Sequence, residues 1–129
     1  MPAHVSCIWN MNRQAHLVIG VVLFLVYVYV TGFFHHTASD LFVYGIVAVT
    51  AGSLLPDVLE PPTSAKHRCI CHSRRALKSV SVMFLLTAMP VLFAPGIVHF
   101  PLVFSASCFF LGYAVHLLAD SLTRAGLPG

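Results

Sequence analysis

Long stretches without charge constrain this chain more than any other feature. No Lys, Arg, Asp or Glu lies between Asp40 and Asp57, and none lies between Lys78 and Asp120. A transmembrane helix needs about 20 mostly apolar residues, so the second stretch is long enough for two crossings. Hydrophobic residues make up 58% of the chain and charged residues 9%, whereas a soluble domain carries about 25% charged residues. A chain of 129 residues cannot bury so much apolar surface in one soluble core, so lipid must cover the rest.

We therefore predict an all-α, polytopic membrane protein with four transmembrane helices in a single domain, residues 1–129. The expected helices are about 15–34, 41–56, 80–94 and 102–120, and a polar loop at 57–79 joins the second to the third. Pro56 is expected to end the second helix and Pro90 to interrupt the third. No small-residue cleavage site follows the first apolar run, which indicates a retained helix rather than a signal peptide.

The basic residues predict the orientation of this bundle. With four crossings, both termini and the 57–79 loop share one side, and all 7 basic residues then lie on that side. Lys and Arg mark the cytoplasmic side, so we expect a cell-membrane protein with both termini in the cytoplasm and the lipid bilayer as its partner. Seven basic residues do not make a nucleic-acid patch, and nucleic acid is not expected to bind. Five of the seven lie in the loop: Lys66, Arg68, Arg74, Arg75 and Lys78.

Ionisable side chains from distant parts of the sequence are expected to converge at the cytoplasmic ends of these helices. Ionisable groups near hydrocarbon usually face the bundle interior, and imidazole with carboxylate suits zinc, manganese or iron. An open position on such a metal can hold water and lower its pKa to about 7, which makes a nucleophile for hydrolysis. His116 and Asp120 share a helix face, which continues back through the small residues Gly112, Cys108 and Ser105. The predicted ligands are His16, Asp57, His67, His72, His116 and Asp120.

Each of these features also has a structural interpretation. His16 fits an interfacial histidine, Asp57 fits a turn residue, and His116 with Asp120 fits a hydrogen-bonded pair at a helix end. The basic loop fits a segment that sets topology and contacts anionic lipids. The hypothesis of a metal site therefore depends on the convergence of all six residues.

Three segments carry a family resemblance. They are Gly52-Ser53-Leu54-Leu55-Pro56-Asp57, the loop His67-Arg68-Cys69-Ile70-Cys71-His72-Ser73, and the run from Gly112 and Tyr113 through His116, Asp120, Thr123 and Gly126. On these segments the chain resembles the YdjM-like family of membrane-bound, metal-dependent hydrolases, which are small inner-membrane proteins. His16, at the start of the first helix, completes the resemblance.

The resemblance implies an enzyme that activates water on a divalent metal, with zinc as first choice and manganese or iron as alternatives. On the hypothesis of an enzyme, Asp57 or Glu60 would act as general base if it does not bind the metal, and Arg68 or Arg74 would stabilise a developing oxyanion. The substrate would be a membrane-proximal ester or phosphoester such as a phospholipid.

The chain departs from the family pattern at two positions. Many relatives carry a second Asp where this chain has Leu59, which argues against a full two-metal site and leaves Glu60 as the substitute acid. Cys69 replaces a glycine and lacks its conformational freedom, and the thiols of Cys69 and Cys71 are alternative soft ligands. Two other functions stay open: a non-enzymatic membrane protein for metal or ion binding or transport, and a small interaction protein that forms homo-oligomers.

Overall fold

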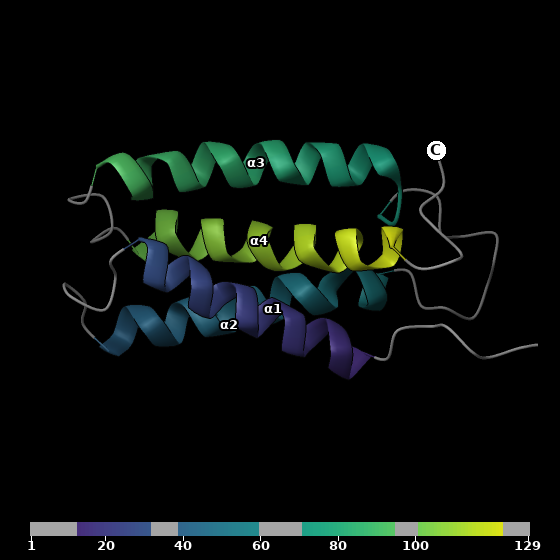
Figure 1. Ribbon diagram of the computed structural model, residues 1–129, viewed down its shortest axis with the longest axis horizontal. Helices are drawn as coiled ribbons and strands as arrows, with labels where there is room; N and C mark the ends of the chain where they lie inside the picture. The colour runs from purple at the N-terminus through teal and green to yellow at the C-terminus, as the bar shows by residue number, and fades with distance from the viewer. Residues whose placement is uncertain (1–12, 32–38, 60–70, 95–100, 123–129) are drawn as a thin grey trace, which may run out of the picture.

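The computed structural model describes residues 13–31, 39–59, 71–94 and 101–122. Four helices make up nearly all of this part of the chain: α1 (Arg13–Val30), α2 (Ser39–Leu59), α3 (Arg74–Phe93) and α4 (Pro101–Ser121). The helices alternate in direction along the bundle (Figure 1). The start of α1, the end of α2, the start of α3 and the end of α4 therefore lie at the same end. The prediction of an all-α, polytopic membrane protein is confirmed.

The helices have the length and the surface expected of membrane spans. Three stretches are long and apolar enough to cross a bilayer, namely Asp40–Leu59, Arg74–Phe93 and Pro101–Ser121, and α1 contributes the shorter apolar stretch Gln14–Val30. Large apolar side chains such as Tyr29 and Leu86 face outward, while Ser107 and His116 are fully buried. An apolar exterior with the polar groups inside the bundle is the arrangement that lipid favours, because polar groups must find partners there.

Helix α4 lies at the centre of the bundle and packs against the other three helices. Its approach to α2 is the closest, because glycines face backbone on both sides. A Cβ at Gly52 would overlap the carbonyl oxygen of Phe109, and a Cβ at Gly112 would overlap the carbonyl oxygen of Val49. Small residues let helix backbones approach in membranes, where dispersion contacts rather than hydrophobic burial hold helices together.

Aromatic and hydroxyl side chains connect the helices in the middle of the bundle. The hydroxyl of Tyr27 on α1 donates to Oγ of Ser107 on α4 at 3.0 Å. The Tyr27 ring also meets the Phe84 ring of α3 edge to face, with centroids 5.8 Å apart. Phe24 and Phe104 are fully buried beside this contact. These residues give the bundle a close-packed interior between its two ends.

Two proline expectations were wrong. Pro56 lies inside α2, which continues to Leu59, and Pro90 lies inside α3, which continues to Phe93. A proline removes only one backbone donor, and membrane helices tolerate this because nearby groups satisfy the freed carbonyl. The consequence is that Asp57, expected in a loop, lies in the last turn of α2.

The start of α3 also differs from the prediction of a loop that runs to residue 79. Ser73 caps the helix with extended backbone (φ −102°, ψ 160°), and its Oγ accepts the N–H of Ala76 at 3.1 Å. Serine is a favoured cap because its oxygen satisfies a helix donor that has no partner in the helix. Three basic residues assigned to the loop therefore lie exposed on the first turns of α3: Arg74, Arg75 and Lys78.

Candidate metal centre

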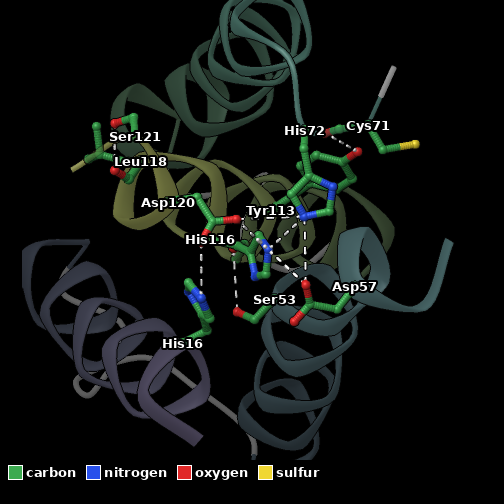
Figure 2. Close-up of polar contacts among 11 residues, drawn as sticks. His16, Ser53, Asp57, Cys71, His72, Tyr113, His116, Leu118, Asp120 and Ser121 are labelled. Carbon is green, nitrogen blue, oxygen red and sulfur yellow. Dashed lines mark hydrogen bonds and ion pairs between the residues drawn. The ribbon is translucent and has the colours of Figure 1, made fainter. Parts of the chain in front are cut away.

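Five polar side chains meet at the end of the bundle where α1 and α3 start and α2 and α4 finish (Figure 2). His16 comes from the first turn of α1 and Asp57 from the last turn of α2. His116 and Asp120 come from successive turns of α4, and His72 immediately precedes the cap of α3. Residues from four separate segments thus share one small volume.

Local structure explains how each segment delivers its side chain. The close crossing of α2 and α4 at Gly52 and Gly112 brings the ends of these helices together, so Asp57 lies near His116. His72 is held from the other side, because the hydroxyl of Tyr113 donates to the carbonyl oxygen of Cys71 at 3.3 Å. Backbone packing and one side-chain hydrogen bond therefore fix three members of the cluster.

Four donor atoms form a compact group at the centre of the cluster. Nε2 of His72 and Nε2 of His116 lie 3.3 Å apart. Oδ1 of Asp57 lies 3.6 Å from the His72 nitrogen and 3.5 Å from the His116 nitrogen. Oδ2 of Asp120 lies 3.6 Å and 3.4 Å from the same two atoms. Both carboxylates therefore face both imidazole nitrogens.

His16 contacts this group from its α1 side. Its Nε2 lies 3.2 Å from Oδ1 of Asp120, which is the other oxygen of that carboxylate. Its ring stacks on the His116 ring, with centroids 4.2 Å apart and planes 32° apart. The Nδ1 atoms of His16 and His116 are buried and have no hydrogen-bond partner within the described segments. The Nε2 contacts and the ring packing therefore hold these two imidazoles.

The cluster places two carboxylates beside three buried imidazoles. His16, His72 and His116 are each at most 4% exposed, and the side chains of Asp57 and Asp120 are 20% and 24% exposed. Two carboxylates bring two negative charges, and neutral imidazoles bring none. Burial of unbalanced charge is costly, so protons on the imidazoles or a metal ion would stabilise the two carboxylates.

The structure brings together some of the residues singled out in the sequence but not all of them. His16, Asp57, His72, His116 and Asp120 lie in the cluster, and they form two overlapping groups that could hold a metal ion. Arg74 is exposed on α3, and no contact joins it to these five in the described part of the chain. Three further predicted residues, Glu60, His67 and Arg68, lie outside the described residues, as does Cys69.

Residues 11–128 match the model of a family described as YdjM inner membrane protein. The chain belongs to the YdjM inner membrane protein family. The match covers almost the whole chain, including every segment that contributes to the cluster. It therefore confirms the family resemblance and, with the apolar helices, establishes membrane localisation. No curated protein and no solved structure matches the chain.

Supporting residues of this YdjM chain carry weaker sequence signals than the titratable ones. Ser53 is fully buried, and its hydroxyl donates to the Gly112 carbonyl oxygen at 3.4 Å. Tyr113 is part of the family motif, and its hydrogen bond to Cys71 also anchors the segment that holds His72. Their positions in the sequence are the signal that identifies them. Residues three or four apart on a helix are neighbours, and Ser53 lies four residues before Asp57 while Tyr113 lies three before His116.

Proposed function

We propose that the cluster binds a divalent metal and that the protein is a membrane-bound hydrolase of a membrane-proximal ester or phosphoester. The observation that carries the proposal is the spacing of the four central donor atoms. The two imidazole nitrogens lie 3.3 Å apart, and each lies 3.4–3.6 Å from both carboxylate oxygens. Zinc bonds of about 2.0–2.2 Å in tetrahedral geometry require ligand atoms about 3.3–3.6 Å apart. These five pairs therefore have the spacing that ligands of a zinc ion require.

The chemistry of the donors supports the same proposal. Nε2 atoms of His72 and His116 and one oxygen each of Asp57 and Asp120 would hold the ion, and a 2+ charge would balance both carboxylates. Zinc is the first choice for two imidazoles and two carboxylates, and manganese or iron would also accept them. When bound, such a metal polarises an ester or phosphoryl oxygen and activates water at neutral pH.

Other residues of the chain would bind the substrate and move protons. Asp57 directs Oδ1 at the imidazoles, so its second oxygen is the group that would accept a proton from water. Glu60, just after α2, is the alternative base. Arg74 is exposed two residues after His72 and would hold an anionic phosphate, with Arg68 in the same role.

The position of the cluster indicates where the substrate would come from. The cluster lies at the ends of the apolar helices, beside the exposed basic residues at the start of α3. Headgroups of phospholipids occupy this depth in a bilayer, and basic residues at it attract anionic lipids. We assign this face to the cytoplasm by the distribution of Lys and Arg, and we propose a phospholipid or a related phosphoester as substrate.

A second candidate function has one observation in its favour. Four protein donors around one ion would make a closed structural metal site, whereas catalytic zinc sites usually keep one position open. The three imidazoles are also almost fully buried. On this alternative the metal would hold α2, α4 and the start of α3 together, and the protein would bind the ion without turnover.

Hydrolysis by purified protein distinguishes the two candidates. We expect detergent-solubilised protein loaded with zinc or manganese to hydrolyse a chromogenic phosphodiester or a phospholipid in mixed micelles. His72→Ala should lose both metal and turnover, while Leu118→Ala, an exposed site on α4, should keep both. A protein that binds metal and gains thermal stability from it, but hydrolyses no ester across the panel, would establish the structural role instead.

A further inference from the structure

Asp120 presents its two oxygens to different partners. Oδ2 faces the nitrogens of His72 and His116 at 3.6 Å and 3.4 Å, while Oδ1 faces Nε2 of His16 at 3.2 Å. From this division we infer that His16 is a positioning residue that orients Asp120, and that the cluster holds one metal ion rather than two. The inference rests on the proposed metal centre and adds which residues bind the ion and which hold a ligand in place.

The four central atoms supply, without His16, the number of ligands that a zinc ion takes. Each carboxylate oxygen of the set lies 3.4–3.6 Å from both imidazole nitrogens, which is the spacing of about 3.3–3.6 Å for a tetrahedral ion. The ion-pair contact of His16 with the set is to the opposite oxygen of Asp120, and its ring also packs against that of His116. A hydrogen bond from the His16 N–H would fix the rotation of that carboxylate and keep Oδ2 directed at the imidazoles.

Within the described segments, few donors are left for a second ion on the His16 side. The residues there are His16, His116 and Asp120. Nε2 of His116 has a single lone pair, and that atom already belongs to the central set at 3.3 Å from the His72 nitrogen. Among the described residues this leaves Nε2 of His16 and Oδ1 of Asp120, and Nδ1 of His116 could join them only if that ring bridged both ions as an imidazolate. That is fewer protein ligands than a zinc site of ordinary composition has.

The backbone around His16 holds it for this role. Gly20 lies one turn after His16, and a Cβ there would be only 2.5 Å from Oγ of Ser53 on α2. The glycine thus lets α1 approach α2 closely enough for His16 to enter the bundle, where it is 3% exposed. Stacking on the His116 ring at 4.2 Å restricts it further. A rigid donor is what an outer partner of a metal ligand requires.

Two substitutions separate a positioning residue from a ligand. His16→Gln keeps an N–H near the position of the imidazole Nε2 but supplies no imidazole nitrogen to a metal, and His16→Ala removes the donor. We expect His16→Gln to bind one equivalent of metal close to wild-type affinity. His16→Ala should also bind one equivalent, with an affinity about 10–100-fold weaker, as is typical when an outer partner is lost. His72→Ala should bind none.

The readouts are metal content by elemental mass spectrometry, affinity by chelator competition, and the visible absorption of the cobalt(II)-substituted protein in detergent. The cobalt spectrum reports the ligand set, so it should be the same in wild type and His16→Gln. Thermal unfolding of the metal-free variants checks that each is folded. Loss of metal in His16→Gln as complete as in His72→Ala, or a changed cobalt spectrum, would show that His16 is a ligand. Two equivalents in wild type, with one lost in both His16 variants, would also overturn the inference. No metal in wild type would instead refute the proposed function itself.

Discussion

Replacing Gly112 by alanine should disrupt the metal site without touching any of its side chains. A Cβ at this position would overlap the Val49 carbonyl oxygen and would lie 3.0 Å from the Ser53 nitrogen and Oγ. Neither backbone atom can rotate away, so α2 and α4 must separate to reach the ordinary contact distance of 3.4–4 Å. We estimate a separation of about 1 Å at the crossing, which for overpacked interiors costs about 1–3 kcal/mol of folding free energy.

The displacement reaches the candidate metal centre because both helices deliver ligands just beyond the crossing. His116 lies one turn after Gly112 and Asp57 lies just over one turn after Gly52, with 3.5 Å between Nε2 and Oδ1. Metal–ligand distances tolerate only about 0.2 Å of error, so a shift of about 1 Å should remove Asp57 from the coordination shell. We expect metal affinity to fall at least 10-fold, on the scale of losses that follow disturbance of a ligand's support.

Chelator competition in detergent measures that loss, and unfolding in increasing SDS measures the stability change. Leu118→Ala is the matched control, because Leu118 is on the same helix near the site but is 51% exposed. Wild-type affinity in Gly112→Ala, together with an unchanged cobalt(II) spectrum, would show that the α2–α4 approach does not set the ligand geometry.

Three other substitutions test neighbouring parts of the account. Tyr113→Phe removes the hydrogen bond to the Cys71 carbonyl that helps to hold His72 in place. Loss of one hydrogen bond costs about 1 kcal/mol, so we expect metal affinity measured by chelator competition to fall about 5-fold. Tyr44→Phe, at an exposed site on α2, is the control. A double-mutant cycle of Tyr27→Phe and Ser107→Ala should give a coupling free energy of about 0.6 kcal/mol in SDS unfolding. Metal affinity should not change, because the 3.0 Å hydrogen bond between Tyr27 and Ser107 lies away from the site. Neutralising Arg74, Arg75 and Lys78 to Gln should lower retention of anionic phospholipid in native mass spectrometry by about 1 kcal/mol per charge. Equal retention of anionic and zwitterionic lipid by wild type would contradict that last prediction.

The sequence predicts the bundle well because lipid imposes simple rules. Charge-free apolar stretches must be helical in a bilayer, so α2 follows from the gap between Asp40 and Asp57, and α3 and α4 follow from the gap between Lys78 and Asp120. The uncharged stretch between Arg13 and Asp40 gives α1 in the same way. The convergence of the five site residues then follows from topology, because the start of α1 and α3 and the end of α2 and α4 lie at the same end of the bundle. These residues are His16, Asp57, His72, His116 and Asp120.

Features that depend on packing were harder to predict. The continuation of α2 past Pro56 depends on tolerance of a single missing hydrogen bond, and the early start of α3 depends on the Ser73 cap. The α2–α4 crossing depends on which glycines face each other, and a list of glycines in the sequence does not show that Gly52 and Gly112 do. Pairing between helices requires three-dimensional contacts, because hydropathy alone does not rank one helix face above another.

The central claim is that the end of this bundle binds a divalent metal through residues of different helices. Elemental mass spectrometry of detergent-purified protein, compared with a His72→Ala, Asp120→Ala double variant, tests it most directly. We predict about one equivalent of zinc or manganese in the wild type and none in the variant. Absence of metal from the wild type after supplementation, or equal content in the folded variant, would contradict the claim and leave His72 and Asp120 as a hydrogen-bonded pair at a membrane surface.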